Sequence, residues 1–191
     1  MNDKIKVALI YGSARKGRFC DTVARWVAEQ IARHEGFALE VIDPAVDSVQ
    51  APPEDDSLRG APSLWERVAQ ADAFVVVTPE YNHGYPAPLK SLIDSVGAEW
   101  HAKPVAFVSY GGVSGGLRAV EQLRLVFAEL HTVTIRDAVS FAGAWEQFDE
   151  SGALLHPERH QRAMAAMLAR LRWWATALRA ARNAEPYGRA A

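Results

Sequence analysis

The most informative stretch of this sequence is residues 75–90, VVVTPEYNHGYPAPLK. Its opening run of β-branched residues is typical of a strand that is buried on both faces of a parallel sheet. A loop rich in proline and glycine follows, and residues 89–96 then show the amphipathic pattern of a helix. A strand, a polar loop and a helix in this order are the layout of a ligand site at the carboxyl end of a parallel strand.

The same alternation runs through the rest of the chain. Strands are predicted at residues 4–11, 37–42, 73–78, 105–110 and 132–135, or 132–141 if the last strand runs on. Helical patterns lie at residues 21–31, after the Pro62-Ser63 pair, at 89–96, at 117–130 and at 156–184. Strands that alternate with helices predict an α/β fold, a flavodoxin-like doubly wound five-stranded parallel sheet of order 2-1-3-4-5 with helices on both faces.

Length and composition narrow the class of protein. A chain of 191 residues suits a single domain 1–191, with a core at about 4–141 and a C-terminal loop and helix at 142–184. The acidic, proline-containing residues 45–61 predict an exposed surface loop. The formal charge of −2 gives no reason to expect nucleic acid or an anionic membrane as a partner. The arginines of the last third are spaced as on a solvated helix face.

Two further observations concern cysteine and targeting. A single cysteine, Cys20, excludes an internal disulfide, a cysteine-rich zinc site and a cysteine-ligated iron–sulfur cluster, and no metal site is predicted. The N-terminal residues contain no apolar signal region, and no apolar run reaches ~20 residues. We therefore expect a cytoplasmic protein.

The loop after the first strand has the composition of a phosphate-binding loop. Residues 12–22 combine small residues and hydroxyls with three cations, and a helix begins directly after them. Free amides at a helix N-terminus favour an anion. The loop lacks the Gly-Lys-Ser/Thr of a Walker A motif, and it is not a G-x-G-x-x-G loop. The alternative is that Gly12 merely turns the chain and the cations are solvated.

The second loop is the one in the opening stretch. Pro79 and Pro86 stiffen it, and Gly84 allows a positive φ or the close approach of a flat ligand. Tyr81 offers a surface on which an aromatic ring can stack. Glu80 as a general base and His83 as a proton donor are the chemical alternatives, but structural roles are favoured, with Glu80 anchoring the loop and His83 exposed. Neither a second carboxylate nor metal-ligand spacing supports a hydrolase.

The third loop, residues 109–116, has four glycines in six residues. Such density removes side chains where something must lie against the backbone. In a sheet of order 2-1-3-4-5, the loops after strands one, three and four meet at the topological switch point. The three unusual loops are therefore predicted to form one site.

These motifs resemble the NADPH-dependent FMN reductase family, which includes related quinone, azo-dye and chromate reductases. The resemblance covers residues 5–141 and rests on three patterns: Gly12-Ser13-x-Arg15 with Gly17-Arg18, Pro79-Glu80-Tyr81-Asn82-x-Gly84-x-Pro86-x-x-Leu89-Lys90-x-x-Ile93-Asp94, and Ser109-x-Gly111-Gly112-x-x-Gly115-Gly116-x-Arg118-Ala119. Cys20 departs from the family, which commonly has a small polar residue there. A thiol is a poorer donor than a hydroxyl.

The resemblance implies FMN as cofactor and a set of residues that bind it. Its phosphate would be held by Ser13, Arg15, Arg18 and the backbone of Phe19 and Cys20. The isoalloxazine would be lined by Pro79, Glu80, Tyr81, Asn82 and Gly84. Ser109, Gly111 and Gly112 would flank the ring and ribityl chain, with Ser114, Gly115 and Gly116 on the outer side.

The implied activity is ping-pong hydride transfer from NAD(P)H through FMN to a quinone, flavin or similar acceptor. The amide of Asn82 or Gly84 would stabilise the reduced ring, and no side chain is assigned as a catalytic acid or base. Two other functions stay open: a flavodoxin-type electron carrier, and a non-catalytic module that binds or senses flavin.

The resemblance also implies a homodimer or homotetramer, because the family generally associates through helices near the flavin loops. Trp100, Trp145, Trp173 and Trp174 are more large aromatics than one surface normally leaves exposed. Trp173 and Trp174 diverge by about 100° on a helix, so both cannot point into one core. One of them is predicted to contact a partner subunit or the loop at residues 142–156.

Overall fold

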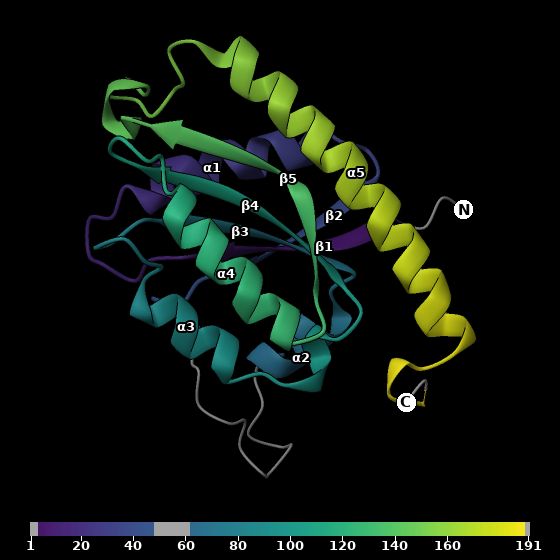
Figure 1. The fold of residues 1–191 in the computed structure, drawn as a ribbon. Helices are drawn as coiled ribbons and strands as arrows, with labels where there is room; N and C mark the ends of the chain where they lie inside the picture. The colour runs from purple at the N-terminus through teal and green to yellow at the C-terminus, as the bar shows by residue number, and fades with distance from the viewer. Residues whose placement is uncertain (1–3, 48–61, 190–191) are drawn as a thin grey trace.

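The structure is a computed structural model that describes residues 4–47 and 62–189. Its centre is a five-stranded sheet of order β2-β1-β3-β4-β5 in which every neighbouring pair is parallel (Figure 1). The strands are β1 (Ile5–Tyr11), β2 (Phe37–Ile42), β3 (Ala73–Pro79), β4 (Pro104–Gly111) and β5 (Val133–Ala142). The predicted strand order and fold class are confirmed.

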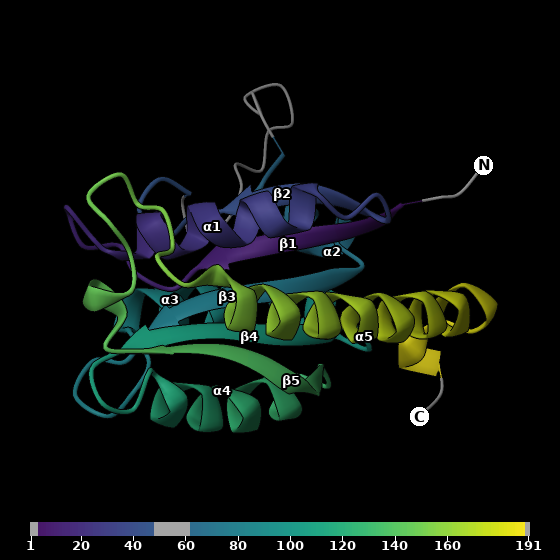
Figure 2. The same ribbon diagram turned by 90° about the horizontal axis from the view of Figure 1, so that it is seen from above.

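Helices cover both faces of the sheet (Figure 2). They are α1 (Cys20–Ala32), α2 (Leu64–Gln70), α3 (Ala87–Asp94), α4 (Leu117–Glu129) and α5 (Pro157–Ala184). Apolar side chains of α1 and α5 form one core with one face of the sheet. Those of α2, α3 and α4 form a second core with the other face. Every residue of β3 and β4 is buried, which explains their unbroken apolar sequence.

Helix starts follow the local sequence. A capping box begins α2, because Ser63 accepts from the Glu66 amide and the Glu66 carboxylate accepts from the Ser63 amide. The third helix begins at Ala87 and ends at Asp94, whereas residues 89–96 were predicted. Pro86 is its N-cap and Pro88 lies in its first turn, where a missing amide costs no hydrogen bond.

Several side chains differ from the expected burial. Trp100 was expected at the surface, but it is fully buried between Phe74 and Phe127. Leu117, the first residue of α4, is 52% exposed. In α5 the core position next to Trp174 is taken by the buried Ala175, and Trp174 itself is exposed. The hydrophobic pattern gives the buried side of a helix, but it does not specify which residues at the boundary are covered.

The last strand shows why its extent was ambiguous. A register irregularity lies between Val105 and Phe107, opposite residues 135–137 of β5. A bulge interrupts the alternation of apolar residues, although pairing continues to Ala142. Of the predicted surface loop, residues 45–47 form a turn and residues 48–61 lie outside the described part of the chain. Among the described helices, none is long and apolar enough to cross a membrane.

Candidate functional site

The loops after β1, β3 and β4 meet at the carboxyl edge of the sheet, where they surround a surface pocket of about 230 Å³. Its lining comes from the first two loops, the end of β4 and the segment after β5: Arg15, Lys16, Gly17, Arg18, Phe19, Pro79, Glu80, Tyr81, Tyr110, Gly111 and Trp145. The structure thus brings together residues separated by more than a hundred positions in the sequence. The other predicted site residues do not line the pocket themselves but belong to the same three loops or flank them: Ser13, Cys20, Asn82, Gly84, Ser109, Gly112, Ser114, Gly115 and Gly116.

The first loop offers a row of backbone donors. Within residues 4–47 and 62–189, no acceptor is bonded to the amides of Ala14, Lys16, Gly17, Phe19 and Cys20. The N-cap of α1 is Phe19, which makes no side-chain capping bond. Unpaired amides at the start of a helix carry partial positive charge and can bind an anion. This arrangement supports a phosphate site rather than a plain turn with solvated cations.

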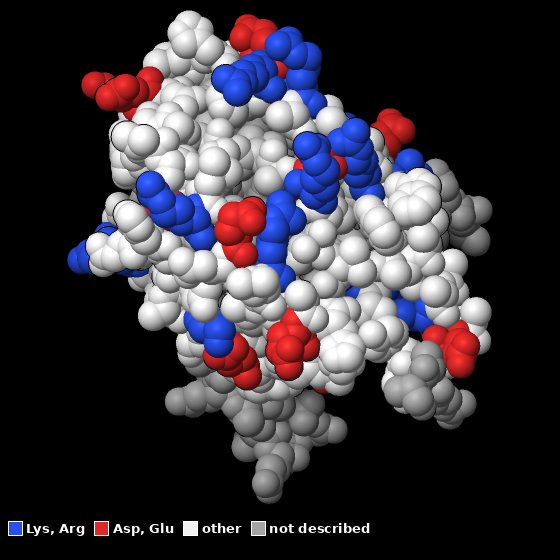
Figure 3. All heavy atoms as spheres, in the orientation of Figure 1, with Lys and Arg blue, Asp and Glu red and all other residues white. Residues whose placement is uncertain are grey.

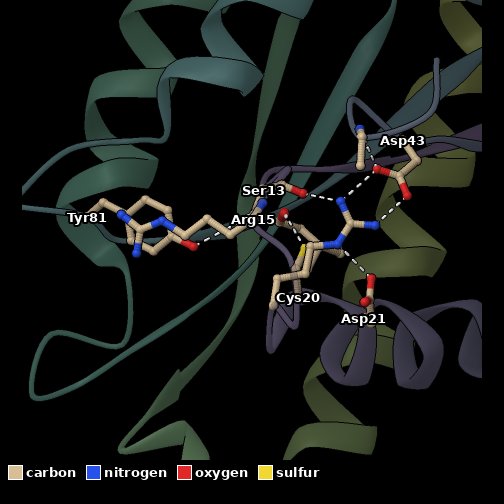
Figure 4. A network of polar contacts seen from close by, with 9 residues as sticks. Ser13, Arg15, Cys20, Asp21, Asp43 and Tyr81 are labelled. Atoms are coloured by element: carbon tan, nitrogen blue, oxygen red, sulfur yellow. Dashed lines mark hydrogen bonds and ion pairs between the residues drawn. The ribbon is translucent and has the colours of Figure 1, made fainter.

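Ser13, Arg15 and Tyr81 form a small contact network between the first two loops (Figure 4). The Ser13 hydroxyl lies 2.9 Å from the Tyr81 hydroxyl and is fully buried. The Arg15 guanidinium carbon lies 3.6 Å from the centre of the Tyr81 ring. Among the described residues, no carboxylate pairs with Arg15, so its charge is free to meet an anion.

Arg18 has different contacts from Arg15. Its Nε donates to Asp21 over 2.7 Å, and its Nη1 and Nη2 both donate to the Asp43 carboxylate. Nη1 also donates to the carbonyl oxygen of Ser13. The Asp43 carboxylate beside Arg18 raises the pKa of that guanidinium, so it is always charged. In Figure 4, Asp43 and Asp21 lie on one side of Ser13, while Arg15 extends over Tyr81 on the other.

Cys20 lies at the start of α1 with its side chain fully buried. The thiol points to the carbonyl oxygen of Val77, at 3.8 Å, and burial raises its pKa. It therefore contributes packing beneath the loop, and its amide is the group available to a ligand. This agrees with the expectation that the thiol is a poor replacement for a hydroxyl.

The second loop is a miniature hairpin. Tyr81 and Gly84 exchange two backbone hydrogen bonds of 2.9 and 3.0 Å, with Asn82 and His83 at the turn. Of the two alternatives for Gly84, positive φ is not adopted there, since it occurs at Asn82 (51°) and His83 (68°). Two successive positive φ values match the tight turn that closes such a hairpin. Gly84 allows close approach, because a Cβ there would lie 3.2 Å from the Gln122 side chain.

Glu80 anchors the second loop to the third, as predicted. Its carboxylate accepts hydrogen bonds from the Ser114 hydroxyl, the Arg118 amide and the Arg118 guanidinium, and its side chain is 7% exposed. Burial tends to raise the pKa of Glu80, but these bonds outweigh burial and lower it. A carboxylate held in the charged form by three donors is a poor proton donor and a weak base.

Much of the glycine content of the third loop serves the protein's own packing. A Cβ on Gly115 would lie 3.0 Å from the Ala142 amide nitrogen, and one on Gly116 would lie 2.9 Å from the Tyr110 nitrogen. The Ser109 hydroxyl bonds the Gly115 carbonyl and is fully buried. Gly112 has no atom within 4 Å of its Cβ position, so it is the open member of the set.

The side chains of Tyr110 and Trp145, which the sequence patterns did not assign to the site, form its other wall together with Phe19. Phe19 contacts Tyr110, Trp145 and Phe148, with ring centres 5.8, 6.1 and 5.6 Å apart. Trp145 was noted as a large aromatic in the segment after the last strand, but as a candidate for subunit contact. Its place at the pocket depends on how the chain returns from β5, which local sequence does not encode.

Other features of the described residues carry no comparable set of groups. A hollow of about 250 Å³ lies between β2 and α2, and one of about 380 Å³ lies between α1 and the start of α5. Neither combines unpaired amides with a cation and an aromatic wall. In the described part of the chain, no three His, Cys, Asp or Glu side chains could hold a metal ion.

The fold and the pocket define a class of protein. A parallel sheet of order 2-1-3-4-5 places its ligand at the β1/β3 switch point. Here that point has an anion-binding loop beside aromatic side chains, which fits a phosphate joined to a flat ring. These are the features of a flavodoxin-like flavoprotein that binds FMN.

Comparisons with known proteins identify the family. The family model described as NADPH-dependent FMN reductase matches residues 5–146. The chain belongs to this family, and it is therefore an FMN-dependent NAD(P)H oxidoreductase, as the sequence motifs had indicated.

Individual proteins that are similar to this chain are also reductases of this kind. An NAD(P)H-dependent FMN reductase of Schizosaccharomyces pombe is 40% identical over 124 residues, which are 58% of this chain and 60% of that protein. A quinone reductase of Pseudomonas putida is 32% identical over 167 residues, covering 81% and 87%. The solved structure of the FerB flavoenzyme of Paracoccus denitrificans superposes with a TM-score of 0.67 at 23% identity, covering 90% and 97%, which supports the fold.

Proposed function

We propose that this chain takes hydride from NAD(P)H and passes it, through FMN held at the β1/β3 edge, to a small acceptor such as a quinone or a flavin. The observation that supports this most is the row of unpaired amides of the first loop beside Arg15, next to the aromatic wall of the same pocket. Relatives named FMN reductase and quinone reductase support these acceptors.

The first loop would hold the FMN phosphate. Arg15 supplies a charge that no described carboxylate neutralises, and the amides of Ala14, Lys16, Gly17, Phe19 and Cys20, unpaired among the described residues, supply donors. The Ser13 hydroxyl, now bonded to Tyr81, lies at the same place. The positive end of α1 adds to the attraction. Arg18 is the third side chain that was predicted to hold the phosphate.

The second and third loops would enclose the ring. Pro79, Glu80 and Tyr81 line the pocket beside Gly111. Of the two amides proposed to stabilise the reduced ring, that of Gly84 is bonded to the Tyr81 carbonyl, which leaves the Asn82 amide available. Gly112 would leave room beside the ribityl chain. Ser109, Ser114, Gly115 and Gly116 would act through the shape of the loop.

FMN, when bound, supplies the two-electron chemistry that joins donor and acceptor. The chain's own residues position it, provide an electrostatic setting and leave one side open for the nicotinamide and then the acceptor. No side chain is proposed as an acid or base, because Glu80 is anchored in its charged form and His83 is exposed.

The face of the molecule drawn in Figure 3 does not favour a dedicated electron carrier. Figure 3 shows Lys and Arg interspersed with Asp and Glu over the described residues of one face, without an acidic patch. Carriers commonly dock through a surface of one sign. We further propose one domain, a cytoplasmic location and a homodimer or homotetramer. Val113 and Leu117, exposed beside the third loop, are consistent with an interface near the flavin site.

Steady-state assays of the FMN-loaded chain test this function. We expect turnover of quinones or free flavin with NADH or NADPH, at rates that depend on the acceptor and the nicotinamide. Azo dyes and chromate complete the acceptor panel. A chain that binds FMN but oxidises neither nicotinamide with any acceptor is a carrier. A chain that is colourless and takes up no FMN is not a flavoprotein.

A further inference from the structure

Arg18 belongs to the phosphate loop, but its side chain faces the protein's own carboxylates. The side chain of Arg18 is 8% exposed and that of Asp43 is 15% exposed. Asp43 directly follows β2, a strand that contributes nothing else to the candidate site. The two ends of this ion pair are 25 residues apart, so the pair fastens the first loop to a separate part of the sheet edge.

The number of guanidinium N–H groups that remain unbonded limits the further contacts that Arg18 can make. A guanidinium has five N–H groups. One on Nε points to Asp21, two on Nη1 point to the Ser13 carbonyl and to Asp43, and one on Nη2 points to Asp43. One N–H on Nη2 remains. Arginine typically binds a phosphate through two parallel hydrogen bonds, which need two N–H groups on one side of the guanidinium. Arg18 could supply them only by releasing Asp43 or Asp21.

The bond to Ser13 has a geometric consequence for the loop. A trans peptide unit is planar, and its C=O and N–H point in opposite directions. Arg18 holds the Ser13 carbonyl, so the Ala14 N–H of the same peptide unit is directed to the other side. That amide is one of the unpaired donors of the loop.

Asp43 is itself held in place. Its carboxylate accepts from the Ala45 amide over 2.9 Å, and its own amide donates to Asp47 over 2.6 Å. Asp47 in turn pairs with Arg67 of α2. The anchor of Arg18 is therefore part of a chain of contacts that reaches a helix on the opposite face of the sheet.

We propose that Arg18 and Asp43 are positioning residues that direct the Ala14 amide toward the FMN phosphate, and that Arg18 is not itself a phosphate ligand. This inference rests on the proposed function, since it concerns the same phosphate site. It assigns a role to Asp43, which lies outside the three loops, and it makes Arg15 the cation that meets the phosphate.

Substitution of Asp43 separates the two roles of Arg18. If Arg18 were a ligand, Asp43→Asn would free its fork, and FMN would bind as well as before or more tightly. A positioning pair predicts the opposite: Asp43→Asn weakens FMN binding about tenfold, the scale of one lost charge-assisted hydrogen bond. Arg18→Lys, which keeps the charge but loses the fork, is expected to weaken binding by a similar factor.

The measurement is the dissociation constant of FMN, from quenching of flavin fluorescence. Riboflavin, which lacks the phosphate, is the reference ligand, and its affinity is expected to stay within twofold in every variant. The double variant should be no weaker than either single variant, because the two residues act as one unit. Asp137→Asn, which breaks the ion pair with Arg170 beside α5, removes the same charge far from the loop and should leave both affinities unchanged.

A second readout uses the chain without flavin. In ¹H–¹⁵N spectra, inorganic phosphate should shift the Ala14 amide of the wild type and of Asp137→Asn, but shift it much less in Asp43→Asn. An equal Ala14 response in all three overturns the inference, as does FMN binding by Asp43→Asn at wild-type strength. If the wild type bound phosphate but no FMN, the proposed function would fail. The shift of the Ala14 amide on addition of phosphate, compared between wild type and Asp43→Asn, would still test whether Arg18 and Asp43 position that amide.

Discussion

Arg15 and Arg18 are three residues apart in one loop, and the sequence gives them the same apparent role. Their contacts in the structure differ, because Arg18 is hydrogen-bonded to the Asp43 carboxylate while Arg15 stacks on the Tyr81 ring. Sequence motifs predict that this loop binds the phosphate. They do not distinguish the two cations, since the carboxylate that pairs with Arg18 follows a different strand. Glu80 shows the opposite case, where the sequence favoured an anchoring role and the structure confirms it.

Arg15→Gln tests the assignment of the free cation. Loss of a charge-assisted bond to phosphate costs about 1.5–3 kcal/mol, so FMN binding is expected to weaken by about 10- to 150-fold. Riboflavin binding should change far less. Fluorescence titration with both ligands measures the effect, and Arg136→Gln, at an exposed position of β5, is the control. Equal losses for FMN and riboflavin would assign Arg15 to the ring instead.

Glu80→Gln separates an anchor from a catalytic base. The amide cannot satisfy three donors, and we expect the free energy of unfolding to fall by about 1–3 kcal/mol. Loss of a catalytic base commonly costs 10²–10⁴-fold in rate, whereas here kcat with FMN bound should stay within about tenfold. Urea unfolding and steady-state rates are the measurements. Glu121→Gln, which removes an exposed partner of Arg124, should cost at most about 1 kcal/mol.

The stabilisation from Glu80 depends on pH in a defined direction. Its pKa in the folded chain lies below the ordinary value of 4.5. The charged carboxylate therefore contributes fully above pH 4.5, and the contribution is lost as the pH falls through the folded-state value. The unfolding free energies of wild type and Glu80→Gln should differ at neutral pH and converge in acid. A difference that grows below pH 4.5 would contradict this.

At the scale of elements, each loop is defined by the strand before it and the helix after it. Composition located all three loops, because proline, glycine and cations interrupt otherwise apolar runs. Composition suggested that the glycines of residues 109–116 leave room for a ligand, but two of them serve the packing of the protein itself. Gly115 and Gly116 are required by contacts with Ser109, Tyr110 and Ala142, which come together only in the folded sheet. The turn at Asn82 and His83 was likewise missed, because non-glycine residues adopt its positive φ values.

Gly116→Ala and Gly112→Ala are predicted to have different effects. Gly116 has a φ of 86°, and its Cβ would lie 2.7 Å from the Ser109 Cβ. Strain and overpacking together should lower the free energy of unfolding by about 2–4 kcal/mol. Gly112 has open space, so its variant should be as stable as wild type yet bind FMN more weakly. Thermal unfolding and FMN titration of both variants measure this, and a stable Gly116→Ala would refute the packing explanation.

At the scale of the whole molecule, the predicted order 2-1-3-4-5 is one of the doubly wound orders that fit the alternating patterns, which by themselves specify only a parallel sheet with helices on both faces. The patterns could not predict how the chain returns after β5 to place Trp145 at the pocket. The exposed pair Trp173 and Trp174 packs edge to face on α5, roughly 24 Å along the helix from its start. The loop at residues 142–156 is therefore out of their reach, which leaves subunit contact as their proposed role.

Sedimentation tests that role. We expect the wild type to associate at micromolar concentration. A buried interface tryptophan commonly contributes 2 kcal/mol or more, so Trp173→Ser should raise the dissociation constant about 30-fold. Val46→Ser, at an exposed apolar position after β2 and away from α4 and α5, is the control. A wild type that sediments as a clean monomer would exclude the interface.

The central claim is that the β1/β3 edge of this sheet holds FMN and reduces it with a nicotinamide. Anaerobic stopped-flow mixing of the FMN-loaded chain with NADPH, followed by the absorbance of oxidised flavin, tests this claim most directly. The flavin is predicted to bleach rapidly and to regain its absorbance when a quinone is added. Flavin that stays oxidised with both NADPH and NADH would contradict the claim.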